Sequence, residues 1–146
     1  MVCECLVEIT TLVVTIVGFL FSIKTLIKGR NDIRISNVIE LKKILNDFTE
    51  INHNLFPSGK WNEFDFDFNS ISIKDFSDFN SYAGTFEIAK LMLENDSLSE
   101  KEFEIFFLYR LSNIATCKAA MSNIMENRSN WKNLLELMKQ FELINE

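Results

Sequence analysis

The first pattern along the chain is an apolar run near its start. Residues 9–23 read ITTLVVTIVGFLFSI without a charged side chain, and apolar residues continue on both sides. A helix needs about 20 such residues to cross a hydrocarbon core of about 30 Å. The pattern therefore predicts one transmembrane helix, and we assign residues 1–30 to a membrane anchor with a basic flank.

The residues that flank this run predict its fate and its orientation. Glu4 and Glu8 precede it and no small-residue cleavage site follows it, so we do not expect a cleavable signal peptide. Four basic residues follow the run, namely Lys24, Lys28, Arg30 and Arg34. Loops rich in Lys and Arg stay in the cytoplasm. The flanks predict a single-pass protein of the cell inner membrane, with its N-terminus outside and its remaining domain cytoplasmic.

Small and polar residues recur along one face of the predicted anchor at alternating spacings of three and four. The predicted association face consists of Thr11, Thr15, Gly18, Ser22 and Thr25. Such residues let transmembrane helices approach closely and hydrogen-bond, and a 3.5-residue period suits a left-handed bundle. We expect the anchor to oligomerise through this face, with Glu4 and Glu8 around the outer mouth. The alternative is a passive tether whose hydroxyl groups bond to carbonyl groups of their own helix.

Beyond residue 30, the apolar pattern predicts helices separated by one aromatic segment. Apolar residues recur at helical spacings over residues 33–51, and Pro57 and Gly59 end that helix. Residues 64–68 then alternate Phe with Asp, which fits a short strand or an extended aromatic loop. This segment is too short to indicate a sheet.

Three further helices are expected in the second half of the chain, over residues 79–95, from Ser99 to about Asn127, and from Ser129 onward. The first and the last of them each present one apolar face that is expected to point inward: Phe79, Tyr82, Phe86, Ala89 and Leu93 in the first, and Trp131, Leu134, Leu135, Met138 and Phe141 in the last. Ser99 and Glu102 form the S-x-x-E pattern of a capping box. The other expected N-terminal caps are Asp75 or Ser77 for the first of these helices, and Ser129 for the last. The fold class is therefore mainly α, with an N-terminal transmembrane helix and a cytoplasmic helical ligand-binding domain over residues 31–146.

Composition and charge narrow the classes of function. Four Gly and one Pro against 47% hydrophobic residues argue against disorder and against a turn-rich β fold. Residues 31–146 contain 12 Lys and Arg against 19 Asp and Glu, a formal charge of −7. Long nucleic acids bind clustered positive charge, so we exclude them as partners. A compact anionic ligand remains possible where a few basic residues converge.

Catalytic and metal-binding patterns are weak in this sequence. The single histidine, His53, has no nucleophile motif or second metal-type ligand at a telling spacing, and we interpret it as a surface residue. Asp65 and Asp67 fit the exposed side of an extended segment better than a cation site. Cys117 is interpreted as a buried apolar residue. We expect neither an enzyme nor a metal site nor a cofactor.

The segment over residues 105–125 is unusual because it lacks acidic residues in an acidic domain, and Arg110 and Lys118 are its only charged residues. Each must pair with a carboxylate, reach solvent or bind an anion, because an unpaired buried charge is costly. The aromatic residues Trp61, Tyr82 and Tyr109 are either core residues or surfaces on which bases stack. The candidate ligand-binding residues are Asn80, Tyr82, Arg110, Asn113 and Lys118.

The layout of an N-out span, a basic flank and an acidic helical domain resembles a class of bacterial membrane proteins. Residues 80–124, which read NSYAGTFEIAKLMLENDSLSEKEFEIFFLYRLSNIATCKAAMSNI, belong to this resemblance. Within that class, the whole chain looks like the membrane-embedded effectors of type III CRISPR antiviral defence that bind cyclic tetra-adenylate. The likeness is one of size, layout and general sequence texture.

The resemblance implies a homotetramer whose cytoplasmic domains bind one cyclic tetra-adenylate, a cyclic oligoadenylate, and whose anchors then rearrange to open a pore or disrupt the lipid bilayer. One basic residue per subunit, supplied four times around a rotation axis, would match the four phosphates of the ligand. Two alternatives remain open. In place of a ligand-binding effector, the chain would be a ligand-independent membrane-perturbing toxin or a membrane-tethered protein-interaction module.

Overall fold

The chain folds into helices. The computed structural model describes the backbone of residues 2–145 and the side chains of residues 16–145. Within these residues the regular elements are helices, as the sequence predicted, and strands are absent. The chain forms two compact units, Met1–Ile35 and Ser36–Glu146.

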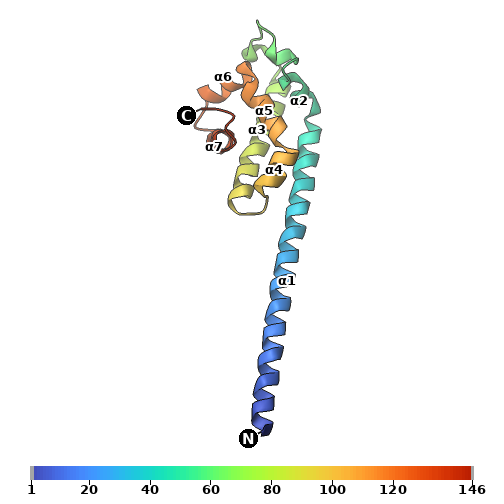
Figure 1. Ribbon diagram of the computed structural model, residues 1–146. Coiled ribbons are helices and arrows are strands. Elements are labelled where there is room, and N and C mark those ends of the chain that lie inside the picture. The colour runs from blue at the N-terminus through green and yellow to red at the C-terminus, as the bar shows by residue number, and fades with distance from the viewer. Residues whose placement is uncertain (1, 146) are drawn as a thin grey trace. The chain divides into compact units, whose positions relative to one another are not determined.

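The first unit is helical throughout its described length. Helix α1 covers Val2–Asp47 and so continues into the second unit (Figure 1). Ser22 Oγ donates to the Gly18 carbonyl at 2.9 Å and Thr25 Oγ1 donates to the Phe21 carbonyl at 3.0 Å. These bonds to their own helix are the ones that the passive-tether alternative predicts.

The membrane prediction concerns residues that are only partly described. Among residues with described side chains, no helix combines the length and the apolar character needed to cross a bilayer. The predicted run starts at Ile9, and its side chains up to residue 15 lie outside the described set. Thr11 and Thr15 of the predicted association face are among them.

The second unit contains the end of α1, six further α-helices and two short 3₁₀ helices among the described residues (Figure 1). They are α2 (Thr49–Leu55), η1 (Lys60–Asn62), η2 (Phe68–Ser70), α3 (Ile73–Glu94), α4 (Glu100–Phe106), α5 (Leu108–Thr116), α6 (Lys118–Glu126) and α7 (Lys132–Gln140). The most extensive helix pairing joins α3 to α7. One apolar core lies among these helices, and α1 to α7 all contribute buried side chains to it.

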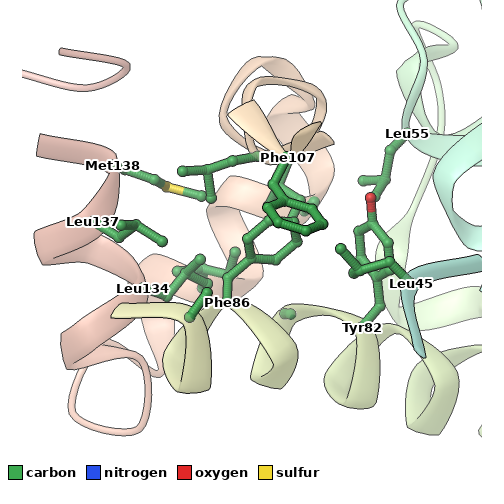
Figure 2. Packing of buried hydrophobic residues seen from close by; sticks show 14 of the residues in the cluster. Leu45, Leu55, Tyr82, Phe86, Phe107, Leu134, Leu137 and Met138 are labelled. Atoms are coloured by element: carbon green, nitrogen blue, oxygen red, sulfur yellow. The ribbon is translucent and has the colours of Figure 1, made fainter. Parts of the chain in front are cut away.

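Figure 2 shows how this core is filled. Leu134 and Met138 of α7 point toward Phe86 of α3 and toward Phe107, which lies between α4 and α5. All four side chains are almost completely removed from solvent. The predicted apolar stripes of α3 and α7 face this core, because each helix buries one stripe. In α7, Trp131 and Phe141 of the predicted stripe are only partly buried, and Leu137, which was not predicted, is fully buried.

The prediction of one long helix from Ser99 to about Asn127 is wrong, because this segment forms the three helices α4, α5 and α6. It is divided at Phe107, with φ −130° and ψ −23°, and at Cys117, with φ −78° and ψ 106°. The divisions let α5 pack on α2 and α7 while α6 packs on η1 and η2. A straight helix cannot follow the curved surface of this core, so packing overrides the continuous helical propensity of the segment.

Of the predicted N-terminal helix caps, one is confirmed and two are wrong. The capping box of Ser99 and Glu102 is confirmed, with both reciprocal hydrogen bonds present. Helix α3 begins earlier than predicted because Ser72, rather than Asp75 or Ser77, accepts the Asp75 amide at 3.0 Å. Ser129 does not cap α7, which follows Trp131 without a side-chain cap. Instead, the Leu134 amide donates to the Glu87 carboxylate of α3, an acceptor distant in sequence.

Residues 64–67 of the Phe-Asp alternation form a loop between η1 and η2, and Phe68 begins η2. The loop interpretation therefore holds and the strand does not. Phe64 is fully exposed, whereas Phe68 is buried against Trp61 and Phe79. Asp67 accepts the Asn69 amide at 2.9 Å and caps η2. The aromatic residues thus close one end of the core.

Gly59 holds the turn between α2 and η1 by a close backbone approach. A Cβ atom there would lie 2.2 Å from the His53 carbonyl oxygen and 2.4 Å from that of Asn54. We expect Gly59→Ala to lower the free energy of unfolding by about 1–2 kcal/mol, as overpacked sites do. Chemical denaturation followed by tryptophan fluorescence measures this change.

Gly84→Ala is the matched control for this prediction. Gly84 lies within α3, and a Cβ atom there meets nothing within 4 Å. Because Ala favours a helix over Gly by up to about 1 kcal/mol, this variant should be as stable as the wild type or more so. Equal destabilisation by both substitutions would contradict the role of Gly59.

Candidate functional site

A groove lies where the end of α1 meets α4 and α5 in the second unit. Its volume is about 270 Å³. Its lining combines cationic, amide, aromatic and aliphatic side chains from these helices. The lining residues are Lys42, Leu45, Asn46, Ile105, Phe106, Phe107, Tyr109 and Arg110.

Arg110 of α5 is held at the C-terminal end of α1. Its Nη1 donates to the Leu45 carbonyl at 2.7 Å and its Nη2 donates to Asn46 Oδ1 at 2.8 Å. The last turn of α1 contains no basic residue of its own. The C-terminal end of a helix carries carbonyl groups without hydrogen-bond donors and a partial negative charge. The guanidinium group donates to one of these carbonyl groups, and its positive charge compensates the negative end of the helix. Arg110 therefore fastens α5 to the end of α1.

Lys42 is the second cation of the groove. Its ammonium nitrogen lies 4.1 Å from the centroid of the Phe106 ring, within the range of a cation–π contact. Lys42 comes from α1 and Arg110 from α5, so the two positive charges reach the groove from different helices. The residues that line the groove include no carboxylate. Its charge is thus opposite to that of the chain as a whole.

Tyr109 gives the groove an aromatic surface in contact with solvent. This side chain is 52% exposed, and its ring centroid lies 5.5 Å from the Arg110 guanidinium carbon. Arg110 Nε also donates to the Tyr109 hydroxyl at 2.6 Å. An exposed aromatic ring beside a fixed guanidinium group is the pairing on which nucleotide bases and phosphates bind.

A buried polar group lies behind this groove. The Tyr82 hydroxyl donates to Asn52 Oδ1 at 2.9 Å, and Asn113 Nδ2 donates to the same oxygen at 3.3 Å. Burial raises the pKa of Tyr82 well above its ordinary value, and the positive charge of Arg110 opposes that rise. Tyr82 and Asn113 therefore connect α3 and α5 to α2.

The structure brings together only some of the residues proposed from the sequence. Arg110 lies in the groove, whereas Tyr82 is fully buried behind it and Asn113 is half-buried beside Tyr82's partner. Asn80 is half-buried on α3 and Lys118 is exposed at the first residue of α6; neither lines the groove. All described hydrogen bonds of the Arg110 side chain go to neutral oxygens, so the carboxylate pairing considered for it is not observed among the described residues.

Sequence reasoning missed Lys42 and Asn46 as members of the site. Both lie on the polar side of a helix. They join Arg110 in one groove because α5 bonds to Asn46 and Leu45 of α1, which precede Arg110 by 64 and 65 residues. Tyr109 was already a candidate for base stacking. The only local signal for the missed pair was that α1 ends without a basic residue to compensate its carbonyl groups.

A larger hollow lies elsewhere, and its charged lining is mostly acidic. It measures about 670 Å³ and adjoins the aromatic loop. Its charged lining residues are Glu50, Lys60, Glu63, Asp65, Asp67 and Asp75. This excess of carboxylates repels phosphate, so the smaller groove is the better candidate for an anionic ligand. Within the described part of the chain, no cluster of His, Cys, Asp and Glu is placed to hold a metal ion.

Tyr82→Phe tests the buried group. Removing the hydroxyl leaves Asn52 Oδ1 without its shorter hydrogen bond, and we expect a loss of about 1 kcal/mol in the free energy of unfolding at neutral pH. An ordinary tyrosine titrates near pH 10. Because the buried residue keeps its proton at a pH where the unfolded chain loses it, its contribution to stability is complete below about pH 10 and falls above that pH.

Denaturation curves from about pH 8 to about pH 11 measure this effect, with wild type and Tyr82→Phe compared at each pH. The stability advantage of the wild type should shrink above about pH 10, because Phe does not titrate. The comparison cancels the titration of the lysines, which both proteins share. Curves that stay parallel throughout would contradict the burial of an ionisable phenol.

Comparisons with known proteins place this chain in no group. No protein-family model matches it, no curated protein matches it, and no solved structure matches it. The candidate site therefore rests on its own geometry and charge.

Proposed function

We propose that this chain is a membrane-tethered sensor that binds a phosphorylated, nucleotide-type ligand in the groove of Lys42, Tyr109 and Arg110. One observation carries the proposal. Two cationic side chains and an exposed aromatic ring line a groove without a carboxylate, in a chain whose formal charge is −6. In this proposal a nucleotide base stacks on the Tyr109 ring, and the positive charges of Lys42 and Arg110 bind the phosphate.

The bonding of Arg110 supports phosphate as the anionic group. Its guanidinium group now donates to a backbone carbonyl, an amide oxygen and a phenol oxygen, all of them neutral. An ionised phosphate adds the attraction between opposite charges to these hydrogen bonds, and it can accept two N–H groups of one guanidinium group. A phosphate in the groove would therefore compete with the end of α1 for the same guanidinium group.

The same contact supports a route from ligand to anchor. Arg110 bonds to the last turn of α1, and the apolar run proposed as the inner-membrane anchor belongs to that helix. A ligand shifts a conformational equilibrium only through different affinities for two states. Redirecting Arg110 from the α1 carbonyl to a phosphate is such a difference. In this proposal the domain is cytoplasmic and the anchors associate through the face that includes Gly18, Ser22 and Thr25.

The resemblance to type III CRISPR effectors supports cyclic tetra-adenylate as the specific ligand. A homotetramer with one groove per subunit supplies four copies of Lys42, Tyr109 and Arg110 around a rotation axis. Four equivalent grooves match a ligand with four equivalent nucleotides. Ligand binding would then rearrange the anchors and compromise the membrane, as an antiviral effector and not as an enzyme.

Binding of radiolabelled cyclic tetra-adenylate to the full-length chain in nanodiscs of zwitterionic lipid tests the proposal. Cyclic tri-adenylate, cyclic hexa-adenylate, linear tetra-adenylate and ATP serve as competitors. We expect selective binding that Lys42→Gln weakens at least tenfold, equivalent to about 1.4 kcal/mol. Lys43→Gln is the matched control, because Lys43 is also exposed on α1 but does not line the groove.

Each outcome bears on a different part of the proposal. Binding of ATP or linear tetra-adenylate alone, still lost in Lys42→Gln, would retain the nucleotide site and reject the cyclic ligand. Equal effects of Lys42→Gln and Lys43→Gln would reject the groove. No binding of any nucleotide by a folded chain would reject the sensor and leave the toxin and the interaction module as the remaining alternatives.

A further inference from the structure

A second pocket lies between the end of α6 and the outer face of α7 in the helical unit. Its volume is about 400 Å³, within the range of small-molecule sites. It is formed by the end of α6, the following turn, α7 and the C-terminal segment. The residues that line it are Met125, Arg128, Lys132, Leu135, Glu136, Lys139, Ile144 and Asn145.

The charge of this pocket is positive. Arg128, Lys132 and Lys139 stand against a single carboxylate, that of Glu136. Glu136 lies 3.9 Å from the Lys132 ammonium group and so is matched by it. The side chains of Arg128 and Lys139 make no ion pair or hydrogen bond with any other described residue. Two cations therefore remain available to an anion.

The rest of the lining includes three apolar side chains. Leu135 is 8% exposed, Ile144 is partly buried against the core, and Met125 is 45% exposed. A hydrated inorganic anion would gain nothing from these three side chains. An alkyl chain would cover them and remove its own surface from water. The lining thus fits a ligand with one anionic end and one apolar end.

We propose that this pocket binds a single-chain amphiphile with an anionic head group, such as a medium-chain carboxylate or alkyl phosphate. The head group lies between Arg128 and Lys139, and the chain lies over Leu135, Ile144 and Met125. This site shares no lining residue with the groove of Lys42 and Arg110. It is therefore independent of the proposed nucleotide function.

A chain-length series tests the proposal on the full-length protein in nanodiscs of zwitterionic lipid. Acetate, hexanoate, octanoate and decanoate are titrated while the NMR signals of the Leu135 and Ile144 methyl groups are followed. We expect affinity to rise with chain length by up to about fourfold per methylene. Decyl phosphate should bind in the same place, and decyltrimethylammonium should not. A parallel sample in nanodiscs that contain phosphatidylglycerol tells a free amphiphile from a bilayer lipid as the source of the head group.

Variants connect the binding to these residues. Arg128→Gln combined with Lys139→Gln should weaken decanoate at least tenfold, and Met125→Gln should flatten the dependence on chain length. Lys101→Gln, an exposed lysine on α4, is the control and should change neither. Equal binding of acetate and decanoate, equal binding of the cationic amphiphile, or an unaltered Arg128/Lys139 double variant would each overturn the proposal.

Discussion

Phe86→Ala is expected to lower the free energy of unfolding by about 3–5 kcal/mol, the largest effect of any substitution considered for this chain. Phe86 is 1% exposed, and its ring centroid lies 5.6 Å from that of Tyr82 and 6.4 Å from that of Phe103. It lies between α3 and α7, where Leu134 and Met138 point toward it (Figure 2). Truncation leaves a cavity that the surrounding helices fill only partly.

Guanidinium denaturation followed by the fluorescence of buried Trp61 measures this loss. Phe64→Ala is the matched control, because Phe64 is the same residue type and is 100% exposed. Its substitution should change the free energy of unfolding by less than about 0.5 kcal/mol. A loss below about 1 kcal/mol for Phe86→Ala would contradict the central place of this ring in the core.

Arg110→Ala is expected to cost about 2–3 kcal/mol of folding stability, because hydrogen bonds to charged groups contribute more than neutral ones. The substitution removes the donors to the Leu45 carbonyl and to Asn46 Oδ1 and leaves the end of α1 without its cation. Arg110→Lys should recover only part of this loss, because a lysine ammonium group cannot reproduce the planar fork that reaches both acceptors. The same denaturation experiment measures each variant.

Lys118→Ala is the control for this second prediction. Lys118 belongs to the same acid-free segment of the sequence but is exposed at the start of α6. We expect its removal to change stability by less than about 0.5 kcal/mol. Equal losses at Arg110 and Lys118 would show that Arg110 does not fasten α1 to α5.

Local patterns in the sequence were informative wherever one helix decides the outcome. The stripe of Phe79, Tyr82 and Phe86 predicted the buried face of α3, since residues three and four apart share a helix face. The reciprocal bonds of Ser99 and Glu102 form within one turn, and they too were predicted. Cys117 is buried, as expected for a small apolar residue.

Predictions failed where a distant part of the chain supplies the partner. Helix α7 begins without the expected Ser129 cap because Glu87 of α3 accepts the Leu134 amide. The helix predicted from residue 99 is divided because its segments pack on different neighbours. No Gly or Pro lies near Phe107 to predict that break from the sequence. Such partners depend on the tertiary arrangement of the chain.

The candidate site also combines features that the sequence predicts with a feature that only tertiary packing determines. Amino-acid sequence alone determined that this chain is mainly helical, that it carries a formal charge of −6, and that Arg110 lies in a segment without acidic residues. Only the tertiary structure decided which cation accompanies it. Lys118 is nearer in sequence, but Lys42 lines the same groove because the end of α1 packs beside α5. Helical periodicity is a property of neighbouring residues, whereas a binding groove is made by segments that only packing brings together.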